Sequence, residues 1–158
     1  SDPQATRYTL RIHSDVAETL AWIDAIRRLY DKRGHGPWAV IRKSDKILLG
    51  YCGCGITQVD GTEVCEIGYR IIPSQWNQGY ATEAAGACIE DVFQSLSHPR
   101  VVALIQAANA ASFRVAEKVG MNYQKDTLYE GVMMRMYEIY SPRRDTKDDN
   151  NANSFSTI

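Results

Sequence analysis

The sequence has no excess of charge of either sign. Its 18 Lys and Arg residues nearly balance 19 Asp and Glu residues, giving a formal net charge of −1. Nucleic acids and anionic membranes bind proteins through basic clusters or polybasic segments, and this chain has neither. We therefore expect no nucleic-acid partner and no membrane partner.

Long apolar runs are also absent. No segment approaches the roughly 20 apolar residues that a membrane-spanning helix needs. The N-terminus lacks the charged and apolar regions of a signal peptide. These absences favour a cytoplasmic protein.

The cysteines have neither the paired spacing nor the clustered histidines of a zinc site, so no metal is expected. Nor do they indicate a disulfide framework, and we predict that they are small buried residues in a reducing compartment. They are Cys52, Cys54, Cys65 and Cys88. The glycine-rich motifs of dinucleotide-binding and P-loop proteins are missing as well, which argues against an ordinary nucleotide-binding α/β domain.

The most informative stretch runs from Glu66 to Glu83. An apolar run that starts at Glu66 leads into the polar turn 78–82, and an alanine-rich helical pattern follows. A strand, a glycine turn and a helix start in this order leave backbone N–H groups free at the positive end of the helix dipole. We therefore predict a phosphate-bearing cofactor with a carboxylate nearby.

The rest of the pattern predicts an α+β fold with a mixed, mostly antiparallel sheet. Asp60-Gly61 indicates a tight hairpin, and Gly131 a closing one. Residues 1–141 form one predicted domain, and 142–158 a polar tail. Helices are predicted at 15–33 (with Ser14 as the N-cap), 82–96 and 109–119, and strands at 38–42, 46–59, 64–72, 101–105, 123–130 and 132–140. The crossover helix at 82–96 makes strands 64–72 and 101–105 parallel.

Two segments resemble the GNAT superfamily of acetyl-CoA-dependent N-acetyltransferases, and most closely its ribosomal-protein-alanine acetyltransferase branch. They are EIGYRIIPSQWNQGYATEA at 66–84 and NAASFRVAEKVGM at 109–121. The resemblance extends from about Trp38 to Tyr140. It implies the acyl-CoA N-acyltransferase fold, in which a parallel strand pair is splayed and helices flank the sheet, with acetyl-CoA as co-substrate.

The resemblance also implies roles for single residues. Backbone amides of the turn would hold the cofactor pyrophosphate, and the splayed strand would bind pantetheine. The residues so implicated in cofactor binding are Gly68, Tyr69, Arg70, Gln78, Gly79, Tyr80, Ala81, Thr82 and Asn109. Glu66 matches a general base for the acceptor amine, because an ammonium ion has no lone pair with which to attack. A water relay is the alternative.

Two features depart from the family. Many members carry a tyrosine acid seven residues after the asparagine, whereas this chain has Ala116. Ser112 is a candidate substitute; water, an unassisted thiolate, Tyr129 and Tyr137 stay open. The family also begins with a strand, but residues 4–10 look like the end of its first helix. We therefore predict that the first strand is missing, which would favour a homodimer or docking of the tail.

The leading functional hypothesis is direct transfer of acetyl from acetyl-CoA to a primary amine in a ternary complex, with Glu66 as base. Protein N-termini, aminoglycosides, polyamines and amino acids all stay open as acceptors, because variable segments build that pocket. Trp38 and Tyr30 are candidate lining residues. The alternative is an acyl-CoA-binding or interaction module with little activity, motivated by Ala116 and the short N-terminus.

Overall fold

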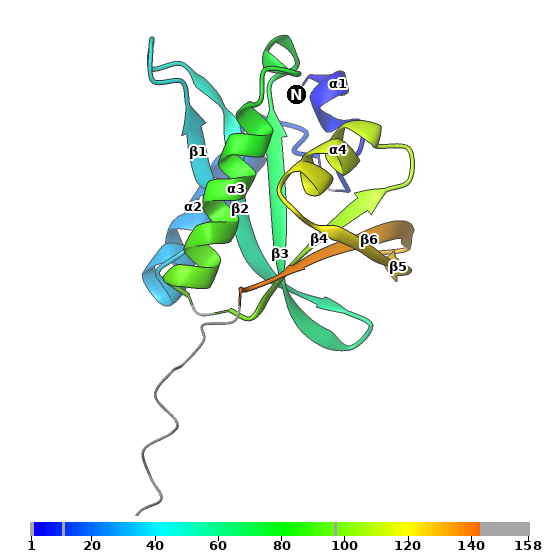
Figure 1. The fold of residues 1–158 in the computed structure, drawn as a ribbon. Coiled ribbons are helices and arrows are strands. Elements are labelled where there is room, and N and C mark those ends of the chain that lie inside the picture. Colours follow the sequence, from blue (N-terminus) through cyan, green and yellow to red (C-terminus); the bar gives the residue numbers. More distant parts are fainter. Residues whose placement is uncertain (1, 11, 97, 143–158) are drawn as a thin grey trace, which may run out of the picture.

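The computed structural model describes residues 2–10, 12–96 and 98–142, so the predicted tail lies almost entirely outside the described residues. Its strands form one sheet in the order β1-β2-β3-β4-β6-β5, flanked by helices (Figure 1). The elements are α1 (Pro3–Thr6), α2 (Val16–Arg33), β1 (Trp38–Ile41), β2 (Leu48–Val59), β3 (Thr62–Ile71), the 3₁₀ turn Pro73–Gln75, α3 (Tyr80–Gln94), β4 (Arg100–Gln106), α4 (Ala110–Lys118), β5 (Asn122–Tyr129) and β6 (Val132–Tyr140).

Both predicted hairpins are confirmed. β2 and β3 are joined by Asp60 and Gly61, which have φ values of 48° and 75°. β5 and β6 are joined by Glu130 and Gly131, with φ values of 48° and 79°. Two successive residues with positive φ match the right-handed twist of the strands they connect. Because β1 also pairs antiparallel with β2, the strands β1-β2-β3 form an antiparallel meander.

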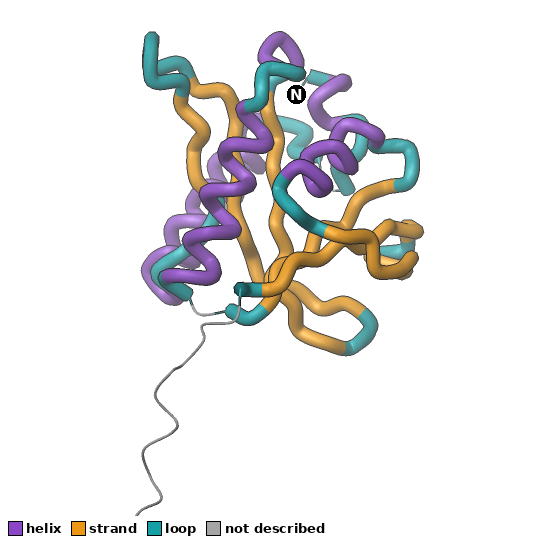
Figure 2. The backbone as a smooth tube through the Cα atoms, in the orientation of Figure 1, coloured by secondary structure: helices purple, strands orange, loops and turns teal. Residues whose placement is uncertain are grey.

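The predicted parallel pair is confirmed, and it is short. β3 and β4 pair only through Cys65 with Val101 and Glu66 with Val102. Beyond that point β4 continues to pair with β6 but not with β3, so the two strands diverge (Figure 2). The crossover helix α3 covers the sheet on one side of this gap. The divergence leaves β3 and β4 unpaired beyond Glu66 and Val102.

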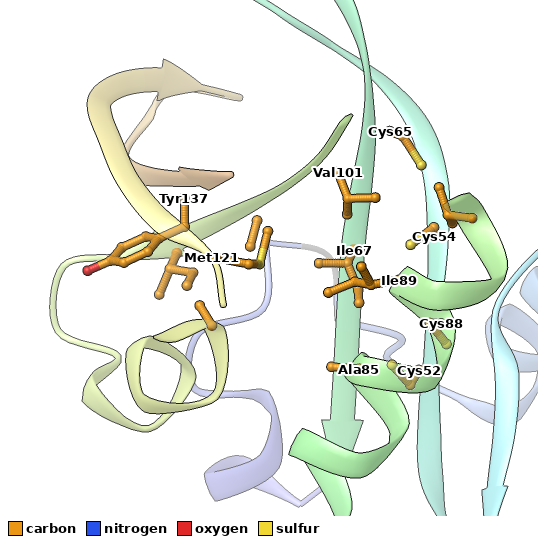
Figure 3. Packing of buried hydrophobic residues seen from close by; sticks show 14 residues of the cluster. Cys52, Cys54, Cys65, Ile67, Ala85, Cys88, Ile89, Val101, Met121 and Tyr137 are labelled. Atoms are coloured by element: carbon orange, nitrogen blue, oxygen red, sulfur yellow. The ribbon is translucent and has the colours of Figure 1, made fainter. Parts of the chain in front are cut away.

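The main core lies between the sheet and the helices α3 and α4. Figure 3 shows Cys52, Cys54, Ile67, Ala85 and Ile89 packed together there. All four cysteines are buried and have free thiols, which confirms their prediction as buried residues. On the other face of the sheet, a smaller cluster forms around Val64, Val102 and Met136.

The start of α2 corrects one expectation. Asp15, not Ser14, is the N-cap, and its carboxylate accepts a hydrogen bond from the Glu18 N–H at 2.8 Å. The Ser14 N–H donates to the Glu18 carboxylate at 2.6 Å. A charged acceptor suits the positive end of the helix dipole better than a hydroxyl does, so the aspartate takes the capping position.

The apolar residues of α2 recur at helical spacing, yet the stripe they form is not buried. No residue of α2 is buried, and Val16 and Leu20 are 74% and 56% exposed. Trp22 of the helix contacts the sheet, with its ring 5.3 Å from that of Tyr51. Among the described residues, none before Trp38 belongs to a strand, as the comparison of 4–10 with a helix end predicts.

In the described part of the chain, no helix combines the length and apolar character needed to cross a bilayer.

Candidate active site

A cavity of about 600 Å³ lies between the N-terminal ends of α3 and α4, next to the C-terminal end of β3. Gln4 and Ala5 of α1 also line this cavity. The following residues predicted for the site line the cavity: Tyr69, Arg70, Gly79, Tyr80, Ala81, Thr82, Asn109 and Ser112. Glu66, Gly68 and Gln78 are not among the lining residues, and neither are Trp38 and Tyr30. The fold thus brings the two sequence motifs to one cleft.

The N-terminus of α3 borders the cavity and has no side-chain cap. Its N-cap, Gly79, has a φ of 88° and supplies no side-chain hydrogen bond to the first turn. A Cβ at this position would meet nothing within 4 Å, so the backbone conformation, rather than a lack of space, is what favours glycine here. The first N–H groups of the helix are therefore left for a ligand at the positive end of its dipole.

Asn109 and Tyr69 organise the opposite wall. Asn109 is the N-cap of α4, and its side-chain oxygen accepts from the Ser112 N–H at 3.2 Å. The Tyr69 hydroxyl donates to the Ser112 carbonyl at 3.1 Å, which ties β3 to α4. Burial raises the pKa of Tyr69 to about 12. These bonds fix the width of the cleft near the point where the strands part.

The candidate proton donors differ in their position relative to the cavity. Ala116 of α4 is buried in the main core and offers no hydroxyl. Tyr137 is 7% exposed, and its ring packs 5.6 Å from Phe113. Tyr129 hydrogen bonds to Thr57 at 2.9 Å and packs on the smaller cluster, across the sheet from the cleft. Of the residues named for this role, Ser112 alone lines the cavity.

Glu66 lies on the face of the sheet opposite the cleft. Side chains alternate along a strand, and Ile67 and Tyr69 belong to the core under α3 and α4, so Glu66 and Gly68 face the other side. Burial raises the pKa of Glu66 to about 7, with a further contribution from the negative charge of Glu130. Gly55 is its partner in β2 and adds no side chain beside it.

The N-terminal segment is part of the site, which the sequence did not reveal. The Tyr8 hydroxyl donates to the Ala108 carbonyl at 3.0 Å, and the Gln106 amide donates to the Tyr8 carbonyl at 3.2 Å. Arg70 of β3 donates to the Thr9 hydroxyl. The segment therefore spans the open end of the gap between β3 and β4. Backbone carbonyls of residues far apart in the chain accept two of these three bonds, so no sequence pattern signals them.

The cleft is also rich in cations. Arg7, Arg70, Arg114 and Lys118 line it, and no Asp or Glu lies among the described lining residues. Sequence reasoning missed Arg114 and Lys118. Arg114 and Lys118 are four residues apart in the helix that follows Asn109, so they lie on one face of that helix. This spacing can be read from the sequence alone. In the described ranges, no group of three or more His, Cys, Asp or Glu residues could hold a metal ion.

Comparison with known proteins decides the family. Residues 1–122 match the family model described as acetyltransferase (GNAT) domain. The chain belongs to the GNAT acetyltransferase family. It is 36% identical over 127 residues to YkkB, an uncharacterized protein of Bacillus subtilis, covering 79% of this chain and 72% of YkkB. This confirms the resemblance read from 66–84 and 109–121.

Solved structures show the same GNAT fold. A GNAT-family acetyltransferase from Bacillus anthracis superposes with a TM-score of 0.68 at 26% identity, covering 89% of this chain and 84% of that chain. A putative ribosomal-protein-serine acetyltransferase from Vibrio cholerae gives a TM-score of 0.68 at 23% identity, with coverage of 87% and 84%, and at that identity it supports the fold alone. As a family member, the protein is an acetyl-CoA-dependent N-acetyltransferase that moves acetyl to an amine.

Proposed function

We propose that this acetyltransferase transfers acetyl directly to a primary amine within a ternary complex, with Glu66 as the general base. The acceptor is a protein N-terminus or a small-molecule amine. The observation that carries the proposal is the position of Glu66. It belongs to the last residue pair that joins β3 to β4, at the point where the two strands diverge.

The divergence lets the two substrates meet. The cofactor occupies the cleft on the α3 and α4 face, with its pyrophosphate at the N–H groups that follow Gly79. Beyond Glu66 the edge of β3 toward β4 has no strand partner, so its backbone can hydrogen bond to pantetheine and polarise the thioester carbonyl. The acetyl group then enters the gap, and the amine approaches from the face that carries Glu66.

The attack needs one proton to leave the ammonium form of the amine. A carboxylate with a pKa of about 7 is both ionised and basic enough to accept that proton near neutral pH, directly or through one water. Once Glu66 has taken the first proton from the ammonium ion, the amine lone pair attacks the thioester carbonyl and a tetrahedral intermediate forms. The nitrogen then loses its second proton to solvent, and the C–S bond breaks with the CoA thiolate as leaving group. The leaving thiolate has an ordinary pKa near 8.5, so it departs with help from solvent or the Ser112 hydroxyl.

The base assignment is tested with Glu66→Gln in a turnover assay against peptide N-termini, polyamines, aminoglycosides and amino acids. Wild-type kcat/KM should fall on the acid side of about pH 7, and the variant should lose this limb together with roughly 10²-fold or more in rate. Glu63→Gln, an exposed carboxylate of the same strand, is the matched control and should behave as wild type. Unchanged kcat/KM in Glu66→Gln for every accepted amine would disprove the role.

A further inference from the structure

Two glycines lie beside Glu66 on the sheet face that carries the proposed base. Gly55 of β2 is directly opposite Glu66, and Gly68 is two residues further along β3. Residues that are opposite in a pair, or two apart in one strand, point to the same face, so both positions share the face of the carboxylate. Gly68 is exposed and Gly55 is half-buried. We call these two residues the glycine floor.

The fold explains two other glycines of β2, but not the glycine floor. A Cβ on Gly50 would lie 1.9 Å from the Arg70 carbonyl oxygen, and one on Gly53 would lie 2.4 Å from the Cα of Pro37. A Cβ at either floor position would meet nothing within 4 Å. Neither floor residue has a positive φ, and β2 pairs with β3 without a shift of register. Close packing, left-handed backbone and a bulge therefore do not account for the glycine floor.

A glycine inside a strand weakens the sheet, because it loses more conformational entropy on folding than other residues and packs no side chain. Such a glycine is typical of places where a ligand approaches the backbone closely. A molecule on the glycine floor would touch backbone and lie beside the Glu66 carboxylate. The cofactor cavity lies on the other face, and neither floor residue lines it. The acceptor is therefore the substrate that meets this description.

Side chains border the glycine floor at both ends. Toward one end, Tyr51 and Arg70 are opposite each other in β2 and β3, with the guanidinium 5.5 Å from the ring centroid. Toward the other end, the hydroxyls of Thr57 and Tyr129 are hydrogen bonded at 2.9 Å. Glu66 and Arg70 are four residues apart in one strand, which corresponds to about 13 Å. The floor is thus a short strip of bare backbone between two ridges of side chains.

The segment before β1 borders the strip along its third side. Pro37 lies over Gly53, which precedes Gly55 on the same face of β2. The Tyr30 hydroxyl donates to the carbonyl oxygens of Gly36 and Pro37, at 3.0 and 3.1 Å. Helix α2, which carries Tyr30, therefore holds this side of the strip in place.

We propose that the glycine floor holds the acceptor and selects amines whose nitrogen is bonded to a substituted carbon. With its nitrogen at the Glu66 carboxylate, such an amine places that carbon over the floor, where the two missing side chains leave room for the substituent. An amine on an unbranched carbon makes fewer contacts with the bare backbone. Amino acids and peptide N-termini other than glycine have a substituted carbon, and linear polyamines do not. This inference rests on the proposed function and names the class of acceptor.

The test measures acetyl transfer by the full chain to glycinamide, L-alaninamide, L-phenylalaninamide and spermidine, with release of CoA as the readout. The three amides present the same kind of amine and differ only in the substituent on the adjacent carbon. Wild type should prefer L-phenylalaninamide to glycinamide by about ten-fold or more in kcat/KM, with L-alaninamide between them. Spermidine should be a poorer acceptor than either substituted amide.

Gly55→Ala and Gly68→Ala each place a methyl group in the room meant for the substituent. Each change should lower kcat/KM for L-phenylalaninamide by about ten-fold or more and that for glycinamide by less than about three-fold. The KM for acetyl-CoA should stay at the wild-type value. Gly86→Ala is the matched control, because Gly86 lies in α3 and a Cβ there would also meet nothing within 4 Å. It should leave the preference among the amides unchanged.

Three outcomes overturn the inference. A wild type that prefers glycinamide or spermidine to both substituted amides does not select a substituted carbon. Equal losses for all amines in the floor variants show that the methyl group disturbs the base instead. A raised KM for acetyl-CoA in Gly68→Ala, with the preference among amides unchanged, assigns the floor to the cofactor. In each case turnover of any amine still supports the proposed function, whereas a chain that acetylates no amine of any class contradicts both.

Discussion

Glu66 of β3 lies beside Val102 of β4, and no pair further along joins these two strands. One residue thus marks the end of the parallel ladder and also carries the carboxylate that we propose as the base. Its neighbours in β3 alternate between the cleft and the opposite face, so the backbone at this point borders both compartments. The position of the carboxylate follows from the place at which the ladder ends.

Replacing this carboxylate should change stability in a way that depends on pH. The pKa of Glu66 is raised from its ordinary value of 4.5 to about 7. Below pH 4.5 the group is protonated in both the folded and unfolded states and contributes no penalty. Between pH 4.5 and about 7 the unfolded chain has lost a proton that the folded chain still holds, so the folded state is progressively disfavoured, and the penalty levels off above pH 7.

Glu66→Gln should therefore raise the free energy of unfolding by roughly 1 to 3 kcal/mol at pH 8 and by almost nothing at pH 4. Urea titrations of wild type and variant at both values measure the difference. A difference that stays constant between pH 4 and pH 8 would contradict the raised pKa.

Tyr69→Phe should affect stability more than chemistry. The change removes the hydroxyl that donates to the Ser112 carbonyl, at a cost of about 1 kcal/mol. A phenol whose pKa is about 12 holds its proton more tightly than a thiol with a pKa near 8.5, so it is a poor acid for the leaving thiolate. We expect kcat to fall less than about ten-fold. A hundred-fold loss of kcat with unchanged stability would assign Tyr69 to catalysis instead.

Two replacements of Asn109 separate its capping role from its predicted cofactor role. Asn109→Ala removes the acceptor for the Ser112 N–H and should cost about 1 kcal/mol of stability. Asn109→Ser keeps an N-cap oxygen and should preserve stability. If the asparagine amide contacts the cofactor, both variants bind acetyl-CoA more weakly. Wild-type affinity in Asn109→Ser would limit the residue to capping.

Two glycines of β2 that are two residues apart should respond very differently to the same small change. A Cβ on Gly53 would lie 2.4 Å from the Cα of Pro37, whereas one on Gly55 would meet nothing within 4 Å. Gly53→Ala should therefore destabilise the protein by about 2 kcal/mol or more. Gly55→Ala should stay within about 1 kcal/mol of wild type. Thermal unfolding of both variants measures this, and equal melting temperatures would show that the segment before β1 yields easily.

Local chemistry explains what the sequence predicted well. The pairs Asp60-Gly61 and Glu130-Gly131 specify hairpins through their own backbone preferences, and Gly79 sets the start of α3 in the same way. The crossover between β3 and β4 follows from the length of the helix that joins them. These signals involve residues close together in the chain, so a sequence reader could locate the cleft from the two motifs that line it.

The sequence did not decide between neighbouring residues that can play the same structural role. Ser14 and Asp15 can each cap a helix, and the carboxylate took the position because it suits the dipole better. The apolar stripe of α2 has helical spacing, yet the sheet offers it little surface to cover. Periodicity predicts a helix, but it does not say whether a neighbouring layer exists.

The sequence by itself determined the turns, the order of helices and strands, and the family, because each depends on residues that are neighbours in the chain. The tertiary structure decided the rest. It placed Tyr8 against Ala108, set the raised pKa of Glu66 through burial and the charge of Glu130, and aligned Arg114 and Lys118 with the cavity. Burial, field and cavity shape arise only when distant segments pack together, and no local pattern encodes them.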